Sequence, residues 1–74
     1  MEREQRNIID FLVSCIGAFA ERFSVTNKYA YDYLNRYQGF AFLYKHYRTE
    51  HTLSIDDCVD DAVAICVRHG GMLQ

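Results

Sequence analysis

The sequence predicts an all-α protein, a compact bundle of three long helices and one short helix in a single domain over residues 1–74. Half of the residues are hydrophobic, so the chain has enough apolar material for one small core. There is no proline, and the four glycines are mostly spaced like helix ends rather than like the frequent turns of a small β-protein. Helices are therefore the expected elements.

The first predicted helix covers residues 1–23. With about 100° between successive residues, its apolar side chains fall on one continuous arc, whereas Asp10, Ser14, Gly17 and Glu21 fall opposite. The apolar run inside this helix is too short and too often interrupted to cross a bilayer, and no secretory cleavage site follows it. We therefore expect a core helix and a soluble, cytoplasmic protein without membrane partners.

The second helix is expected to begin after a cap at Thr26 or Asn27 and to run to about residue 37, with Gly39 as the left-handed residue beyond its end. Its apolar and aromatic side chains spread over about 200° of the helix surface, whereas a surface helix normally buries a stripe of about 100°. Part of this aromatic arc should face away from the core. The rings concerned are those of Tyr29, Tyr31, Tyr33 and Tyr37.

The third predicted helix is short and covers residues 40–47, and a loop is expected at residues 49–52. Ser54 then begins a capping box, which predicts the fourth helix over residues 55–69. Aspartates in its first two turns and a pair of glycines after its end suit the helix dipole and a helix stop. Its buried stripe is expected to contain Ile55, Val59, Ala62, Val63 and Cys66, with Cys58, Ile65 and Val67 at the margins.

The three cysteines form no CxxC motif. Cys58 and Cys66 lie on one predicted helix, about 12 Å apart along its axis, which is beyond the reach of a disulfide. Like Cys15, they occupy apolar positions, where free cysteine behaves as a small hydrophobic residue. We therefore expect three free, buried thiols.

Catalysis requires clustered groups with distinct roles, and the sequence indicates none. His46 and His51 form neither HxxxH nor HExxH, so the ligand spacing of these metal motifs is missing. Ser54 is better explained as a helix cap than as a nucleophile. No glycine-rich phosphate loop is present. We expect no catalytic, cofactor-binding or metal-binding residues, and hence no enzyme.

Two polar features each have two interpretations. His51 and Thr52 either close their loop through hydrogen bonds to nearby backbone or form, with His46 and Tyr47, the polar rim of a binding face. The aspartates of the fourth helix are either a solvated helix start or an acidic ridge that a basic partner compensates, since like charges four residues apart mildly destabilise a helix. The ridge consists of Asp57, Asp60 and Asp61.

Residues 29–52 hold all six tyrosines, and this aromatic surplus is the strongest functional indication in the sequence. A protein this small can hide few such rings. We therefore expect a non-enzymatic protein-interaction module or a homodimer, in which rigid tyrosines anchor the contact. The predicted interface residues are Tyr29, Tyr31, Tyr33, Tyr37, Tyr47, His51, Asp57, Asp60 and Asp61.

The helix, turn and helix around Gly39 also allow a helix-turn-helix interpretation, with DNA as the ligand. Charge disfavours it. Residues 1–48 carry seven basic and five acidic side chains, a balance of +2, whereas residues 49–74 carry one basic and five acidic, a balance of −4. No predicted helix has a basic face that could neutralise phosphates. A mobility-shift assay at low salt would distinguish the two functions.

Three segments resemble a known family: IIDFLVSCIGAFAERFSVT, YDYLNRYQGFAFLYKHY and EHTLSIDDCVDD. They are similar to a family of very small bacterial proteins, mainly from gut Firmicutes and Bacteroidetes, classed as a domain of unknown function. The family shares an N-terminal apolar helix, a central Tyr-Leu segment and a Tyr followed by His-Thr, matched here by Tyr47, His51 and Thr52. Its members are often encoded beside a predicted ADP-ribosyltransferase-like protein. The resemblance therefore implies an antitoxin-like partner or adaptor, without catalytic residues.

Overall fold

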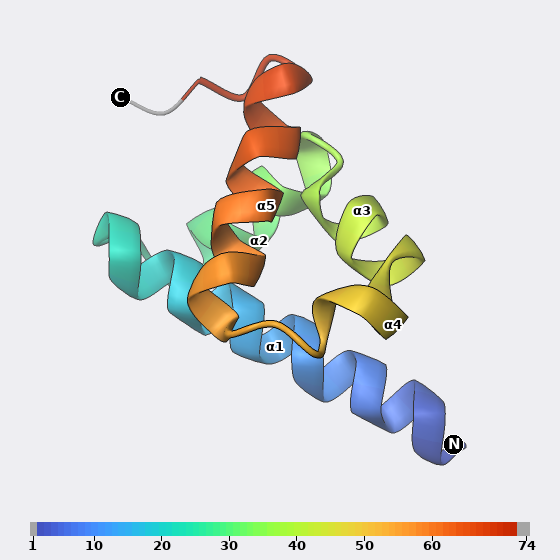
Figure 1. The fold of residues 1–74 in the computed structure, drawn as a ribbon. Coiled ribbons are helices and arrows are strands. Elements are labelled where there is room, and N and C mark those ends of the chain that lie inside the picture. The colour runs from blue at the N-terminus through green and yellow to red at the C-terminus, as the bar shows by residue number, and fades with distance from the viewer. Residues whose placement is uncertain (1, 73–74) are drawn as a thin grey trace.

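The structure, a computed structural model, describes residues 2–72, and within them it has five helices and no strand (Figure 1). The all-α prediction is confirmed, with one helix more than expected. Met1, where the sequence predicts the start of the first helix, lies outside the described residues, as do Leu73 and Gln74. The helices are α1 (Arg3–Phe23), α2 (Asn27–Arg36), α3 (Gly39–Lys45), α4 (Tyr47–Glu50) and α5 (Ile55–Arg68).

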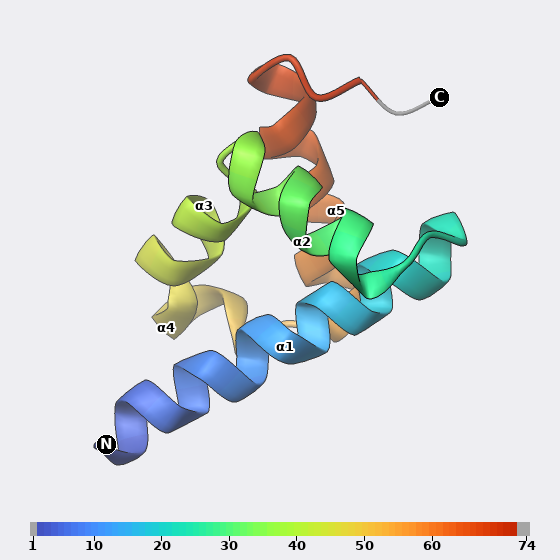
Figure 2. The same cartoon turned by 180° about the vertical axis from the view of Figure 1, so that it is seen from behind.

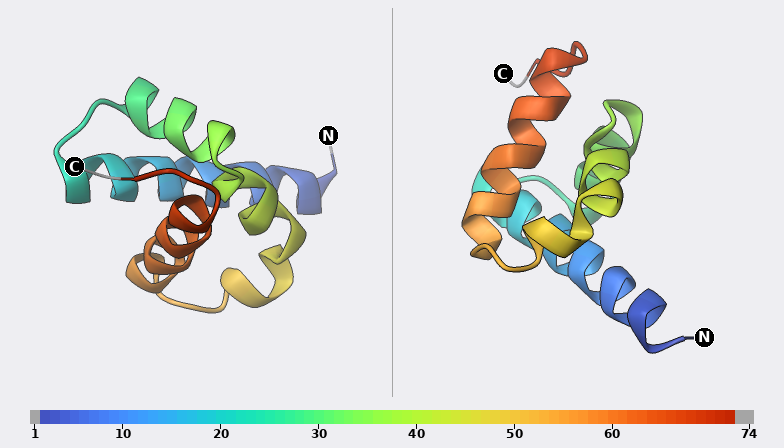
Figure 3. Two further views of the ribbon diagram at one scale, coloured as in Figure 1. Left: turned by 90° about the horizontal axis from the view of Figure 1, so that it is seen from above. Right: turned by 45° about the vertical axis from the view of Figure 1, so that its right-hand side comes forward.

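Helix α1 runs along one side of the molecule, and the other helices all lie on the same side of α1 (Figures 1 and 2). Helices α2, α3 and α5 all contact α1, and α3 also packs against α2 and α5. Seen from above, α1 runs lengthwise while α5 is viewed almost end-on, so α5 stands steeply on α1 (Figure 3). The N-terminal turns of α1 project past the other helices, and the molecule measures 37 × 22 × 21 Å (Figure 2). Some apolar side chains of α1, such as Ile9, are half-exposed.

The core lies where α1, α2, α3 and α5 meet. All three cysteines are free and buried in it, as predicted. Burial raises the pKa of the Cys15 thiol to about 12 and the pKa of the Cys58 and Cys66 thiols to about 11. The thiols therefore stay protonated and pack as small apolar groups. The buried apolar residues are Cys15, Phe19, Ala20, Ala30, Tyr33, Leu34, Leu43, Cys58, Val59, Ala62 and Cys66.

Both predicted helix caps are confirmed. The buried face of α5 differs from the prediction at two residues, one at its margin and one in the predicted stripe. The side chains of Thr26 and Ser54 each accept a hydrogen bond from the backbone N–H three residues further on, at 3.0 and 3.1 Å. Cys58, expected at the margin of α5, is fully buried, whereas Ile55, expected in the buried stripe, is 37% exposed. Ile55 is the first residue of α5, and it faces a surface groove beside α1 instead of the core.

The turn between α2 and α3 corrects a second prediction. Gln38, with φ of 72°, is the left-handed residue, and Gly39 is the first residue of α3. A Cβ on Gly39 would lie 2.8 Å from Leu34 Cδ2 and 2.9 Å from Cys66 Sγ. Glycine is therefore needed here because α2, α3 and α5 approach closely, not because the backbone is left-handed.

The predicted third helix and the loop after it are also corrected. Helix α3 ends at Lys45, and the separate one-turn helix α4 occupies part of the predicted loop. The backbone amides of Thr49 and Glu50 donate to the His46 carbonyl at 3.0 and 2.8 Å, which closes this turn. Glu50 is only 5% exposed, so α4 directs a carboxyl side chain into the protein. A local sequence pattern does not reveal such a contact.

Candidate functional site

The predicted interface residues do not share one surface. Tyr29 and Tyr31 are half-exposed on α2, as the wide aromatic arc predicts. Tyr37 is partly buried and Tyr33 is buried. The second helix therefore presents two of its four tyrosine rings to solvent, and the others belong to the interior or its edge.

Tyr33 is the clearest departure, because it is only 6% exposed. Its ring stacks on Phe19 with the ring centroids 5.2 Å apart, and its hydroxyl donates to the Gly71 carbonyl. Burial raises the pKa of Tyr33 to about 12. The expectation that Tyr33 stands on a contact surface is therefore corrected: its ring completes the core and its hydroxyl anchors the segment after α5.

Tyr47 and His51 pack against each other beside α1. The Tyr47 ring is partly buried, meets Phe11 edge-on at 5.5 Å and lies 4.6 Å from the His51 ring. The Thr52 hydroxyl donates to the Thr49 carbonyl at 2.6 Å, so the loop-closing interpretation is confirmed for Thr52. His51 also stands at the edge of a groove.

The aspartates of α5 lie in different environments. Asp60 accepts a hydrogen bond from the Arg22 guanidinium at 2.5 Å, and Arg22 also donates to the Asp56 carbonyl at 3.0 Å. These contacts tie α1 to α5, although exposed ion pairs of this kind contribute only about 0–1 kcal/mol. Asp57 is exposed and Asp61 is partly buried. The predicted acidic ridge is therefore divided, since Arg22 neutralises one of its members.

Glu50 is a buried acid in a segment that the sequence predicts as a loop. Its Oε1 atom has no hydrogen-bond partner among the described residues. Burial, reinforced by the carboxyl groups of Asp61 and Asp57, raises the pKa of Glu50 to about 7. The Cys58 thiol donates to the Glu50 carbonyl at 3.0 Å. The contact between α4 and α5 therefore contains a group whose charge changes near neutral pH.

A groove between α1 and the α2–α3 pair is lined by apolar and aromatic side chains. It consists of two adjoining cavities of about 210 and 290 Å³, which share two residues of α1. Val13 and Tyr44 are 60% and 63% exposed, and the rings of Tyr31 and Phe40 lie 5.2 Å apart on the side opposite α1. We call this surface the apolar groove; its described lining, which includes no charged residue, is Gln5, Ile8, Ile9, Leu12, Val13, Ile16, Tyr31, Phe40 and Tyr44.

Tyr31 is among the interface residues predicted from the sequence, whereas the contribution of α1 to the apolar groove is not. Ile9 belongs to the predicted core arc of this helix and Val13 to its margin, yet both are among the exposed apolar residues. A signal was present, because the apolar arc of α1 is wider than the stripe of about 100° that a surface helix normally buries. The width of this arc predicts that part of the apolar face of α1 has no packing partner, but it does not identify the residues of that part.

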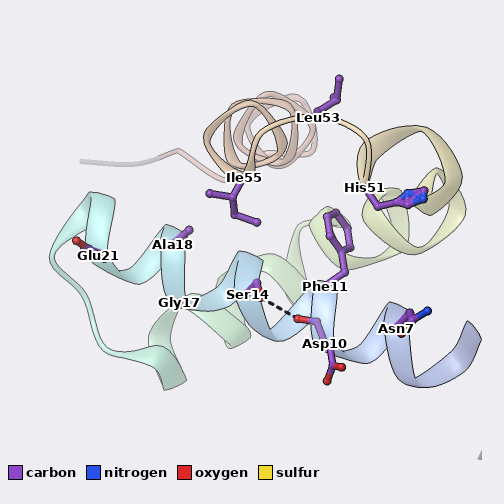
Figure 4. Close-up of a pocket in the computed structure, with 10 residues that line it drawn as sticks. All are labelled: Asn7, Asp10, Phe11, Ser14, Gly17, Ala18, Glu21, His51, Leu53 and Ile55. Carbon is purple, nitrogen blue, oxygen red and sulfur yellow. Dashed lines mark hydrogen bonds between the residues drawn. The ribbon is translucent and has the colours of Figure 1, made fainter. Parts of the chain in front are cut away.

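A second groove runs between α1 and the start of α5 (Figure 4). Its volume is about 730 Å³. Phe11 and Ile55 point into the space between the two helices, and Leu53 stands at its outer edge (Figure 4). We call this surface the α1–α5 groove; its lining is Asn7, Asp10, Phe11, Ser14, Gly17, Ala18, Glu21, His51, Leu53 and Ile55.

Residues 2–72 contain neither a candidate metal site nor a helix that could span a membrane. No three His, Cys, Asp or Glu side chains of this region gather in a way that could hold a metal ion. None of the helices in the same region combines the length and the hydrophobicity that crossing a bilayer requires. Besides the two grooves that border α1, the described surface has a hollow of about 360 Å³ between α3 and α5.

The fold and its surface define a small all-α domain with two grooves that share α1. Residues 10–69 match the model of a family described as a protein of unknown function, DUF3791. This match covers most of the chain, which therefore belongs to that family. Searches of curated proteins and of solved structures find no significant match.

Proposed function

We propose that this protein is a non-enzymatic interaction module that binds an apolar segment of another protein chain in the apolar groove. The observation that carries the proposal is a groove formed by three helices and lined without any charged residue in the described structure. Covering apolar surface contributes roughly 25 cal/mol per Å², and contiguous exposed apolar surface often marks an interface. A helix with apolar side chains on one face is the occupant that suits such a groove.

The aromatic residues of the groove suit the role of anchors. Tyr31 is half-exposed but rests on Phe40, so its ring is already positioned before a partner binds. Rigid aromatic side chains contribute a large contact area for a small loss of conformational entropy. Tyr31 and Tyr44 are therefore the aromatic anchors of the proposed interface, and Val13 is the aliphatic residue opposite them.

The environments of the nucleophilic and basic residues support a non-enzymatic role. Burial raises the pKa of all three thiols well above neutrality, so none is a ready nucleophile. The His46 ring packs against Phe42 at 4.9 Å, and the His51 ring packs against Tyr47. Neither contact is the hydrogen bond between base and nucleophile that covalent catalysis uses.

The partner has two candidates. The resemblance to small bacterial proteins supports the product of a neighbouring ADP-ribosyltransferase-like gene, which this chain would neutralise or connect to other proteins. A second copy of the chain is the other candidate, since an uncharged groove poses no electrostatic barrier to self-association. Co-expression with the neighbouring gene and sedimentation velocity of the isolated chain distinguish these two cases.

Val13→Asp is expected to weaken association with either partner by at least about tenfold, because it places a charge in a contact that excludes water. Val67→Asp is the matched control, since Val67 is also an exposed helical valine, at 41%, and lines neither groove in the described structure. Co-purification and sedimentation velocity measure the effect, and far-UV circular dichroism checks that both variants remain helical.

Three results are decisive for this proposal. Loss of association in Val13→Asp alone supports the apolar groove as the contact surface. Unchanged association in Val13→Asp contradicts it. Equal loss in both variants also contradicts it, because the effect would then come from charge or from the fold in general.

A further inference from the structure

Gly17 lies in the interior of α1, on its exposed side, and forms part of the α1–α5 groove. A Cβ added to it would meet nothing within 4 Å, so no packing inside this chain requires glycine at this position. Glycine in a helix interior is destabilising relative to alanine. A glycine on an exposed helix face does, however, allow another backbone to approach closely. Packing within the chain therefore does not explain a glycine at position 17, whereas the close approach of a partner's backbone would explain it.

The floor of the α1–α5 groove is apolar. Phe11 and Ala18 supply it from α1, and Ile55 supplies it from the first turn of α5 (Figure 4). Ile55 and Leu53 are 37% and 39% exposed, although both are large apolar side chains. The groove follows α1 from residue 7 to residue 21, which corresponds to about 21 Å of helix. An apolar helical segment of about four turns matches this length.

The margins of the α1–α5 groove are acidic. Asp10 and Glu21 lie toward its two ends, and no Lys or Arg belongs to its described lining. Neither of these acids forms an ion pair within residues 2–72. The nearby cations are already engaged, since Arg22 pairs with Asp60 and Arg48 pairs with Glu4. The described lining of this groove therefore carries negative charge that no positive side chain of the lining balances.

We infer that the α1–α5 groove is a second docking site, and that it binds an amphipathic helix of a partner protein whose apolar face carries Lys or Arg at its margins. The partner helix crosses α1 at Gly17, covers Phe11 and Ile55, and places its basic residues near Asp10 and Glu21. A second copy docked through the same groove fits less well, because it would bring Asp10 and Glu21 of one copy toward those of the other. This inference goes beyond the proposed function, because the apolar groove uses a different face of α1.

A fluorescent amphipathic peptide of about 14 residues, built from Leu on one face and Lys on the other, tests the inference. Its matched control has Glu in place of Lys. In fluorescence anisotropy at low salt, the full chain should bind the Leu/Lys peptide at least about tenfold more tightly than the Leu/Glu peptide. The combined variant Asp10→Asn, Glu21→Gln should reduce both this preference and its salt dependence.

Two further variants separate the groove from general adhesion to an acidic protein. Gly17→Leu should weaken binding of the Leu/Lys peptide by at least about tenfold, because the side chain blocks the crossing point. Its helical circular dichroism should persist, since a Cβ at this position meets nothing within 4 Å and leucine favours a helix over glycine. Ala64→Leu, which places a leucine at an exposed position of α5 outside both grooves, should bind as the wild type does. Val13→Asp should leave binding of the Leu/Lys peptide unchanged; weaker binding in this variant would place the peptide in the apolar groove and overturn the inference.

Several results would overturn the inference. Any one of three results is sufficient: equal binding of the two peptides, binding of the Leu/Lys peptide by Gly17→Leu at wild-type strength, or no binding of the Leu/Lys peptide by the wild type. Sedimentation velocity that shows a dimer dissociated by Gly17→Leu would also overturn it, because the occupant would then be a second copy. None of these results bears on the apolar groove, whose test depends on Val13.

Discussion

Glu50→Gln is expected to make the protein more stable than the wild type at pH 8 and to remove most of the loss of stability between about pH 5 and pH 8. Glu50 is buried, and its Oε1 atom has no partner in the described structure. Burial first, and then the carboxyl groups of Asp61 and Asp57, raise its pKa from the ordinary value of 4.5 to about 7. A neutral amide at this position avoids the buried charge.

The sign follows from the two pKa values. Below about pH 4.5 the Glu50 carboxyl is protonated in both the folded and the unfolded protein, so it does not oppose folding. As the pH rises from about 4.5 to about 7, the carboxyl ionises in the unfolded protein while the folded protein keeps it protonated, so the free energy of unfolding falls until the folded protein also loses the proton. The full difference is on the order of 3 kcal/mol. This is a large fraction of the stability of a small domain.

Urea unfolding at pH 5 and at pH 8 measures this effect. The wild type and Glu21→Gln, which changes an exposed glutamate, should lose similar stability between the two pH values. Glu50→Gln should lose much less. The comparison between the variants isolates the contribution of Glu50 from that of the other ionisable groups. A wild-type stability that is equal at both pH values, or an unchanged slope in Glu50→Gln, would show that Glu50 ionises without cost to the fold.

Gly39→Ala is expected to lower the free energy of unfolding by about 1–3 kcal/mol, because it inserts a methyl group into a filled space. The new Cβ would lie 2.8 Å from Leu34 Cδ2 and 2.9 Å from Cys66 Sγ, and both of these residues are buried. Relief requires that the buried side chains of Leu34 and Cys66 change conformation or that α2 or α5 move away from the start of α3. Such a shift disturbs the place where three helices meet.

Gly17→Ala is the matched control, and its effect should have the opposite sign. The same methyl group meets nothing within 4 Å on α1, and alanine favours a helix by up to about 1 kcal/mol over glycine. Thermal unfolding followed by circular dichroism compares the two variants, with about 4–8 °C expected per kcal/mol in a domain of this size. An unfolding temperature of Gly39→Ala at or above that of the wild type would contradict the close approach of these helices.

Features that depend on local chemistry could be predicted from the sequence. The caps at Thr26 and Ser54 follow from side chains that satisfy backbone amides within the same turn. The extent of α5 follows from its cap, its aspartates and the glycines after it. The burial of the three cysteines follows from their apolar positions. None of these features requires knowledge of which helices are neighbours.

Features that depend on neighbouring helices could not be predicted in this way. Helical periodicity gives the order of the tyrosines around the axis of α2, but it does not tell which side of α2 faces α1. It therefore predicts a surface position for Tyr33, whereas in the structure the Tyr33 ring stacks on Phe19. The short helix α4 exists together with a buried carboxyl group, Glu50, which a polar loop sequence conceals. The apolar groove depends on how α2 and α3 are placed beside α1, and that is a property of the tertiary arrangement alone.

Photo-crosslinking at Tyr44 tests most directly whether the apolar groove is a contact surface. Tyr44 is 63% exposed in that groove, and replacing it with p-benzoylphenylalanine keeps an aromatic ring in place. Irradiation of host cells is expected to join the chain to one defined protein, either the neighbouring gene's product or a second copy. The same residue placed at Val67 should give no such product, and Val13→Asp should abolish it. Equal crosslinking from Tyr44 and Val67, or none from Tyr44, would contradict the proposed role of the apolar groove.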